Sequence, residues 1–214
     1  MTRQTIVKIC GLSSPETLLA SIDAGADMAG FVFFEKSPRH IDLETARTLG
    51  LLAQGRIGKV ALTVDADDAA LQEIINALAP DYLQLHGKET PARVAEVKAH
   101  FGLPVIKAAG VATAPDVEAA RAYEGVADVI LFDAKPAPNA AVPGGAGVAF
   151  DWDLLSDVTA KRWMLSGGLD PDNIAEAMRI SGARAVDVSS GVERERGVKD
   201  AGKIRAFVKA ARLS

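Results

Sequence analysis

The feature that most constrains the fold of this 214-residue chain is a regular alternation of short apolar runs with longer, alanine-rich segments of helical period. Runs rich in Val, Ile, Leu and Phe predict eight strands, at residues 6–9, 28–33, 59–64, 82–85, 105–108, 129–132, 163–165 and 185–188. Strands that alternate with helices in this way are typical of βαβ units around a parallel sheet.

The segments between these runs predict helices at 15–24, 43–52, 69–78, 91–101, 115–123, 171–181 and 201–211, with a short one near Trp152. Four of them begin at or beside a proline, which is tolerated in the first helical turn. Ser14, Thr90 and Asp170 precede such prolines and can cap the helix. Glycines near the predicted ends, such as Gly102 and Gly182, favour left-handed C-caps.

Eight βα units in about this length predict an α/β fold in which residues 1–214 form a single (βα)8 TIM barrel. An open, doubly wound sheet is the alternative. The stretch 134–149, rich in Pro, Gly and Ala, could link two domains, but we expect an active-site loop because strands continue on both sides. No G-x-G-x-x-G motif follows the first strand, which argues against a dinucleotide site.

Composition narrows the classes of partner. A net charge of −4 and a pI near 5.4 argue against binding to nucleic acid or to an anionic membrane. No apolar run approaches the roughly 18 residues of a membrane span and no secretory signal is evident, so we predict a cytoplasmic protein. One cysteine and three histidines without carboxylates at ligand spacing predict neither a disulfide nor a metal, and no cofactor is expected.

Reactive side chains collect where the predicted strands end. In such barrels the chemistry lies at the carboxyl ends of the strands. The polar residues at or beside these ends are Cys10, Glu35, Asp65, His86, Lys107, Asp133, Ser166 and Ser189. Because a purely structural repeat has no need for so many reactive groups at one end, we expect a functional site there.

Glycine-rich turns follow the last two predicted strands. Gly167 and Gly168 follow strand 7, and Ser189, Ser190 and Gly191 follow strand 8. The loops after these strands are the usual phosphate position of the fold, since glycine lets an anion approach backbone N–H groups. A third set of donors is predicted at Gly144, Gly145 and Gly147. The alternative for any one loop is that its glycines only turn the chain.

Two residues are candidates for proton transfer. Cys10 shares its side-chain direction with Lys8, whose charge is expected to favour the thiolate, although most lone cysteines are packing residues. Asp133 follows an apolar strand, where desolvation is expected to raise a carboxyl pKa and suit a general acid. Its alternative role is a salt bridge with Lys135 or a helix cap.

Two further residues are candidates for ligand binding. The guanidinium of Arg39 can donate two parallel hydrogen bonds to a substrate carboxylate, although a lone arginine is more often solvated. His86 is either a ligand contact or a satisfied structural histidine. Ser166 and Ser189 have no His and Asp in the arrangement of a hydrolase, and we interpret them as neighbours of a phosphate.

Taken together, the motifs resemble the phosphoribosylanthranilate isomerase family. The resemblance extends over nearly the whole chain and in the family's order. Its blocks are KICGL at 8–12, GFVF at 30–33, SPR at 37–39, QLHG at 84–87, LFD at 131–133, PGG at 143–145, SGGL at 166–169 and DVSSGVE at 187–193. Two departures are Ala146, where the family often has threonine, and Asp65, where it often has asparagine.

The resemblance implies an Amadori rearrangement of N-(5-phosphoribosyl)anthranilate to 1-(o-carboxyphenylamino)-1-deoxyribulose 5-phosphate, a step of tryptophan biosynthesis. It implies that Asp133 is the acid, Cys10 is the base and Arg39 binds the anthranilate carboxylate. The glycine loops would hold the phosphate, with no cofactor. The partner is then a small phosphorylated molecule, and a monomer and a homodimer are both compatible with the sequence.

Three competing functions remain open. The histidine-pathway isomerase performs the same chemistry on a barrel, but a resemblance to it implies that both the acid and the base are aspartates. Cys10 at the first of these positions disfavours it. A phosphopentose epimerase would want a metal and histidine ligands. A non-catalytic phosphate-binding barrel subunit would need neither Cys10 nor Asp133.

Overall fold

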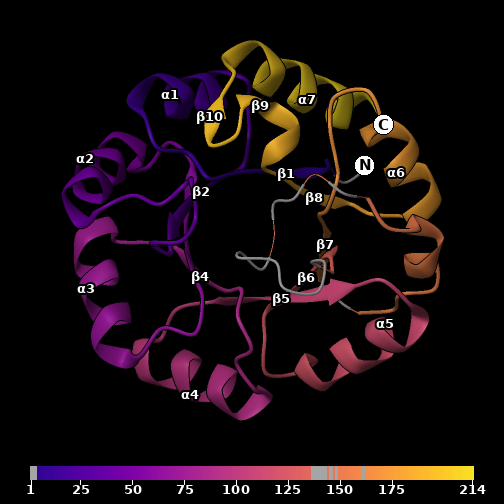
Figure 1. Ribbon diagram of the computed structural model, residues 1–214, viewed down its shortest axis with the longest axis horizontal. Helices are drawn as coiled ribbons and strands as arrows, with labels where there is room; N and C mark the ends of the chain where they lie inside the picture. Colours follow the sequence, from indigo (N-terminus) through magenta and orange to yellow (C-terminus); the bar gives the residue numbers. More distant parts are fainter. Residues whose placement is uncertain (1–3, 136–143, 145–146, 148, 161) are drawn as a thin grey trace.

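In the computed structural model, eight parallel strands close into a barrel inside a ring of helices (Figure 1). The structure describes residues 4–135, 144, 147, 149–160 and 162–214. The barrel strands are β1 (Ile6–Cys10), β2 (Met28–Phe33), β3 (Gly58–Thr63), β4 (Tyr82–Leu85), β5 (Val105–Val111), β6 (Val129–Ala134), β7 (Trp163–Leu165) and β8 (Ala185–Val188). All eight predicted strands are confirmed to within a few residues at their ends.

Closure of the barrel excludes the open-sheet alternative, because β1 pairs with both β2 and β8. In the second pairing Ile6 is opposite Ala185 and Lys8 is opposite Asp187. The strands β6 and β7 also pair directly, with Ile130 opposite Trp163. The stretch 134–149 therefore connects neighbouring strands of the barrel rather than separate sheets.

Helices cover the outside of the barrel and begin where the sequence places capping residues. They are α1 (Pro15–Asp23), α2 (Leu43–Ala53), α3 (Asp68–Leu78), α4 (Pro91–Phe101), α5 (Ala114–Ala120), α6 (Ile174–Ser181) and α7 (Ala201–Leu213). The side chains of Ser14 and Thr90 accept hydrogen bonds from the backbone N–H groups of Thr17 and Arg93. Gly102 and Gly182 adopt the left-handed conformation at the C-caps of α4 and α6, as expected.

Some helix predictions were wrong in detail. The predicted start at Pro171 is incorrect, because α6 begins at Ile174 and Asn173 is its N-cap. Asp170 instead accepts hydrogen bonds from the N–H groups of Asp172 and Asn173 in the preceding turn. The segments near Tyr123 and Trp152 are the 3-10 helices η1 (Arg121–Tyr123) and η2 (Trp152–Leu155).

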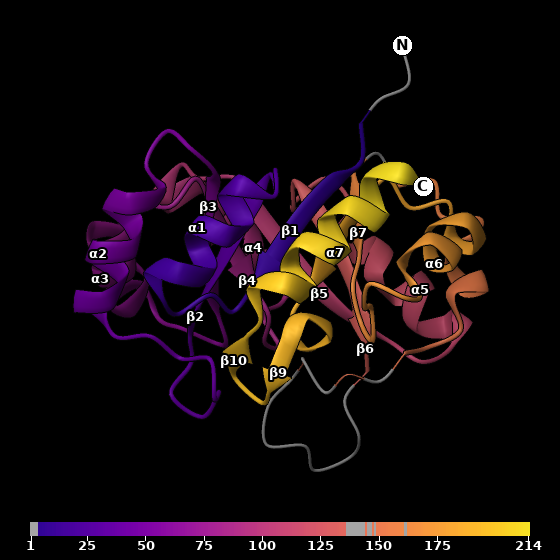
Figure 2. The ribbon, with the colours of Figure 1, turned by 90° about the horizontal axis from the view of Figure 1, so that it is seen from above.

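A short excursion after β8 was missed by the sequence analysis. It consists of the 3-10 helix η3 (Ser190–Val192) and the antiparallel strands β9 (Glu193–Glu195) and β10 (Val198–Lys199). Figure 2 shows β9 and β10 at the end of the barrel opposite to the N-terminus. This is the end at which β1 terminates, so the excursion lies beside the carboxyl ends of the strands.

The core has two main layers, as the alternation of side chains along each strand requires. One layer lies between the strands and the helices and includes Ile9, Phe31 and Phe207. The other fills the barrel interior with side chains such as Val60, Ile106, Leu131 and Met164. Nearer the carboxyl ends of the strands, Cys10 packs with Val32 and Leu62.

Candidate active site

Cys10 lies inside the barrel at the carboxyl end of β1. The side chain is 4% exposed and packs on Val32 and Leu62 of the two following strands. Its register partner on β2 is Gly30, where a Cβ atom would lie 2.9 Å from Cys10 Sγ and 3.1 Å from Lys8 Nζ. Glycine at position 30 therefore leaves room for the thiol and the ammonium group to lie next to each other.

The charge of Lys8 is shared with a carboxylate that the sequence analysis did not consider. Lys8 Nζ donates to Asp187 Oδ1 at 2.7 Å, and Asp187 Oδ2 accepts from Ser166 Oγ at 3.1 Å. Although burial lowers the pKa of Lys8, attraction to Asp187 and Cys10 outweighs burial and raises it to about 12. Lys8 is therefore an ammonium group at neutral pH.

Lys8 lowers the pKa of Cys10, as expected, but its effect is outweighed. Burial raises the pKa of the Cys10 thiol, and the negative charge of Asp187 raises it further. Lys8 and Lys199 act in the opposite direction but do not outweigh burial. In the free protein Cys10 is therefore a thiol, next to a cation that is already paired.

Asp133 is the second proton-transfer candidate and is the penultimate residue of β6. It is 6% exposed, and its Oδ1 accepts the N–H of Ala134 at 2.9 Å. Its Oδ2 lies 3.3 Å from His86 Nε2. The alternative salt bridge with Lys135 is not formed, because Lys135 pairs with Asp116 at 2.6 Å.

His86 reaches Asp133 across the mouth of the barrel, since β5 separates β4 from β6 in the sheet. The other ring nitrogen, Nδ1, lies 2.9 Å from Gln84 Nε2. With the amide in this orientation its N–H donates to Nδ1, which places the ring proton on Nε2, facing Asp133. Gln84 thus selects the tautomer in which His86 donates to the carboxylate.

Gly144 lies over this pair. A Cβ atom at residue 144 would be 2.5 Å from Asp133 Oδ2 and 2.6 Å from His86 Nε2. Gly167, with φ of +85°, approaches from the other side, because its Cβ would be 3.1 Å from Asp133 Oδ1. Two of the predicted phosphate-loop glycines therefore contact the acid candidate closely.

The turns after β7 and β8 lie against each other. Gly167 and Gly168 both have positive φ angles, and a Cβ atom at Gly191 would collide with the carbonyl oxygen of Leu169. Gly147 lies beside Ser190, with its Cβ position 3.3 Å from Ser190 Oγ. The two turns thus form one surface.

Two of the predicted phosphate contacts differ from the others in what the structure describes of them. Ser189 Oγ donates to the carbonyl oxygen of Cys10 at 3.0 Å, which ties the end of β8 to the end of β1. Gly145, the remaining predicted residue, lies outside the described residues, as does Ala146.

Arg39 is not a solvated surface arginine. It is 5% exposed, and its Nε and Nη2 donate to the two carboxylate oxygens of Glu193 at 2.7 and 3.0 Å. Lys199 Nζ donates to the same carboxylate at 2.7 Å and to Ser189 Oγ at 3.0 Å. Although burial raises the pKa of Glu193, its bonds to Arg39 and Lys199 lower it to about 2.

Sequence reasoning missed the role of Glu193 as an internal partner of Arg39. The acidic residue that closes the DVSSGVE block was the available signal, but nothing local indicates that it pairs with a residue 154 positions away.

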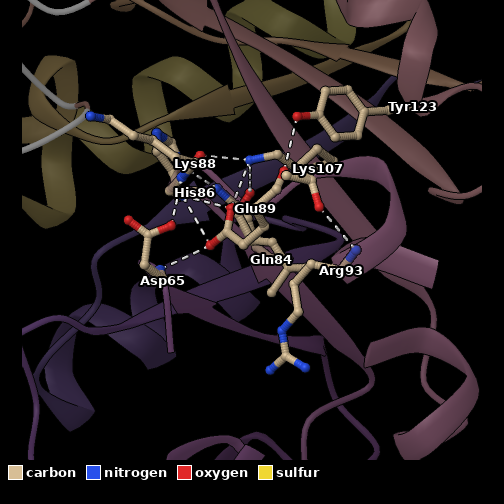
Figure 3. A network of polar contacts seen from close by, with 11 residues as sticks. Asp65, Gln84, His86, Lys88, Glu89, Arg93, Lys107 and Tyr123 are labelled. Carbon is tan, nitrogen blue, oxygen red and sulfur yellow. Dashed lines mark hydrogen bonds and ion pairs between the residues drawn. The ribbon is translucent and has the colours of Figure 1, made fainter. Parts of the chain in front are cut away.

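Lys107 and Asp65 do not belong to the site, contrary to the expectation that all polar strand ends meet there. Lys107 alternates with Ile106 and Ala108, which face the barrel interior, so it points outward. It donates to Glu89 at 2.8 Å and lies 5.5 Å from the centre of the Tyr123 ring (Figure 3). Asp65 Oδ1 accepts the N–H of Lys88 at 2.7 Å in the same network.

Within the described residues, no group of three or more His, Cys, Asp and Glu side chains could hold a metal ion. Among those residues, no helix has the length and apolar character needed to cross a membrane. The arrangement at the mouth consists of a buried thiol on β1, a carboxylate on β6 and the glycine turns after β7 and β8. Such a site can protonate one atom of an anionic ligand and remove a proton from another.

Comparison with known proteins gives one consistent result. The family model described as "PRAI: N-(5'phosphoribosyl)anthranilate (PRA) isomerase" matches residues 7–210. A protein of Nitrobacter hamburgensis named N-(5'-phosphoribosyl)anthranilate isomerase is 59% identical over 98% of this chain and 93% of its own length. One of Rhodopseudomonas palustris with the same name is 56% identical over 98% and 96%.

Two solved structures extend the comparison to the fold. Phosphoribosyl anthranilate isomerase from Thermotoga maritima superimposes with a TM-score of 0.88 at 35% identity, covering 98% of this chain and 100% of that one. A structure of phosphoribosyl anthranilate isomerase in complex with reduced 1-(o-carboxyphenylamino)-1-deoxyribulose 5-phosphate has a TM-score of 0.85 at 33% identity, with the same coverage.

Proposed function

The chain belongs to the N-(5'-phosphoribosyl)anthranilate isomerase family, and we propose that Asp133 and Cys10 are the acid and the base of its reaction. The reaction is the isomerisation step of tryptophan biosynthesis that yields 1-(o-carboxyphenylamino)-1-deoxyribulose 5-phosphate. The observation that carries the proposal is the location of both side chains at one end of the barrel, on β1 and β6.

The first proton transfer opens the sugar ring. Asp133 donates a proton to the furanose oxygen as the bond between that oxygen and C1 breaks, and the nitrogen lone pair forms the C1=N bond of a Schiff base. The resulting Asp133 carboxylate accepts a hydrogen bond from His86 Nε2 and one from the N–H of Ala134. Both bonds stabilise the negative charge that the acid acquires.

The second transfer forms the enolamine. Cys10 first loses its proton to solvent. The thiolate then takes the proton from C2, the C2–H electrons form a C1=C2 bond, and the C1=N electrons return to nitrogen. The enolamine then tautomerises to the ketone. Burial favours the neutral thiol that this step produces. Each proton transfer of this kind contributes about a hundred- to ten-thousandfold in rate.

Substrate binding is assigned to the remaining residues of the mouth. The turns at Gly167–Gly168 and Ser189–Gly191, together with the glycines at 144, 145 and 147, offer backbone N–H groups to the phosphate. Arg39 is assigned to the anthranilate carboxylate, and Glu193 fixes the plane of its guanidinium through Nε and Nη2.

Two substitutions test the assignment. Cys10→Ser and Asp133→Asn should each lower kcat more than about a hundredfold, with binding of a product analogue retained. The loss of the fluorescent anthranilate-linked substrate is followed beside the histidine-pathway substrate, with His100→Gln on the exposed face of α4 as the control. Near-normal turnover in either variant contradicts that residue's role, and activity only on the second substrate contradicts the substrate assignment.

The proposal includes the setting in which the enzyme works. We assign it to the cytoplasm, as a monomer or a homodimer. One structural neighbour is described as monomers generated from the dimeric enzyme of Thermotoga maritima. Sedimentation at micromolar concentration distinguishes the two states.

A further inference from the structure

We propose that the buried ion pair of Lys8 and Asp187 sets the charge state of Cys10. Lys8 stabilises the thiolate, and Asp187 weakens this effect because it pairs with Lys8. Both are positioning residues, because they act through Cys10 and not on the substrate. The inference rests on the proposed role of Cys10 as the base.

The contacts of the pair place it directly beneath the thiol. Lys8 is fully buried and Asp187 is 4% exposed, and they are register partners on β1 and β8. Lys8 Nζ and Cys10 Sγ both border the space left by the missing side chain of Gly30. A buried cation and a thiolate that border the same space interact strongly, because little water screens them.

Asp187 is held so that it competes with the thiolate for Lys8. One carboxylate oxygen accepts from Lys8 Nζ and the other from Ser166 Oγ. Asp187 cannot turn away without losing one of these bonds inside the barrel. Removing Asp187 therefore increases the influence of Lys8 on the thiol, whereas removing Lys8 leaves Cys10 facing a carboxylate.

Lys199, on β10, is the other charged group that acts on Cys10. It is fixed by bonds to Glu193 and to both oxygens of Ser189. These bonds do not involve Lys8 or Asp187, so Lys199 should act alike in all variants. Burial lowers the pKa of Lys199 to about 8, so it loses its charge during the titration, and the variants are compared with the unmodified protein over the same pH range.

The proposal predicts shifts of opposite sign for the two halves of the pair. The thiol pKa should rise by about one to three units in Lys8→Met and fall by about one unit or more in Asp187→Asn. A role limited to packing would move both in the same direction or neither. Below the thiol pKa, each unit of increase lowers the thiolate fraction, and with it kcat/KM, about tenfold.

The chain has a single cysteine, so thiolate absorbance at 240 nm can be titrated without interference from other thiols. For each variant, the same variant carrying Cys10→Ser is subtracted to remove other signals, and kcat/KM is measured over the same pH range. Lys59→Met is the matched control, since Lys59 is also buried in the barrel wall but donates to the carbonyl oxygen of Leu78. It should leave the thiol pKa unchanged.

Lys8→Met leaves a buried carboxylate without its cation and can fail to fold. The double variant Lys8→Met with Asp187→Asn removes both charges, and its thiol pKa should lie between those of the two single variants. If Lys8→Met does not fold, the thiol pKa of the double variant is compared with that of Asp187→Asn alone and should be higher. An unchanged thiol pKa in either folded single variant, or shifts of the same sign in both, overturns the proposal. These readouts are independent of catalysis, whereas an active Cys10→Ser variant would remove the base assignment itself.

Discussion

The Nε2 atom of His86 lies 3.3 Å from Oδ2 of Asp133, and the other ring nitrogen lies 2.9 Å from Gln84 Nε2. Both side chains are largely buried: that of His86 is 11% exposed and that of Asp133 is 9% exposed. His86 was expected to be either a ligand contact or a structural histidine. Its position next to the proposed acid gives it a specific role in stabilising the carboxylate.

His86→Leu should therefore lower kcat. A hydrogen bond to a charged group contributes about 1.5 to 3 kcal/mol, which corresponds to roughly a ten- to hundredfold loss of rate. His86→Gln, whose amide can reach the position of Nε2, should retain more activity. Steady-state kinetics check both, with the exposed His100→Leu as the control. Equal activity in His86→Leu and the unmodified enzyme would contradict the role.

Gly144→Ala should reduce kcat/KM while leaving stability nearly unchanged. The added methyl group would lie 2.5 Å from Asp133 Oδ2 and 2.6 Å from His86 Nε2, so one of these groups must move. A displacement of about 1 Å at a catalytic group can cost about a hundredfold in rate. Kinetics and urea unfolding are measured together.

Gly102→Ala provides the complementary control for this substitution. Gly102 caps α4 with a φ of +65° in open space, so alanine there should cost about 1 to 2 kcal/mol of stability and no activity. If both variants lost activity equally, the close approach of Gly144 would not be the cause.

Glu193→Gln should destabilise the protein by about 3 to 5 kcal/mol at neutral pH. The substitution removes the carboxylate that accepts hydrogen bonds from both Arg39 and Lys199, and the two buried cations then lie next to each other without it. Urea unfolding at pH 7 measures the loss. A change smaller than about 1 kcal/mol would mean that the cluster is well solvated in the folded protein.

The same residue predicts a pH dependence of stability. The pKa of Glu193 is lowered in the folded protein from 4.5 to about 2. Its contribution to stability is therefore present above pH 4.5 and is lost as the pH falls toward 2, because the unfolded chain binds the proton first. The unfolding free energy should decline less steeply over this range in Glu193→Gln than in the unmodified protein. Parallel curves would contradict the assignment.

Lys107→Met should affect stability but not catalysis. Lys107 and Glu89 form an ion pair at 2.8 Å on the outer side of β5, and breaking a buried pair costs about 3 to 5 kcal/mol. Lys98→Met removes a comparable pair with Asp128 that is partly exposed, so it should cost less than about 1 kcal/mol. Urea unfolding compares the two, and kcat of Lys107→Met should stay close to that of the unmodified enzyme.

Much of the fold could be predicted because its signals are local. The period of two in the strands and the capping residues Ser14 and Thr90 act over a few residues, and eight repeats of this unit leave few ways to close a sheet. The end of each strand then follows from the same pattern, which is why Cys10 and Asp133 could be placed at the mouth from the sequence.

The partners of the charged residues could not be predicted in this way. Lys8 and Asp187 are 179 positions apart and meet only because β8 closes against β1. Arg39 meets Glu193 only because the excursion after β8 folds over the loop after β2. Lys107 is the third of the seven residues of β5, so it does not reach the carboxyl end of the strand, and it points to the outside and contributes to stability instead.

The sequence by itself therefore determined the barrel and the two proton-transfer candidates, because strand periodicity is read from neighbouring residues. Only the tertiary structure decided the electrostatics of the site. Whether a cation lowers the pKa of a thiol depends on every charge within a few ångströms and on access of water, and both are set by contacts between distant segments. For Cys10, those contacts raise the pKa of the thiol and pair the Lys8 ammonium group with Asp187.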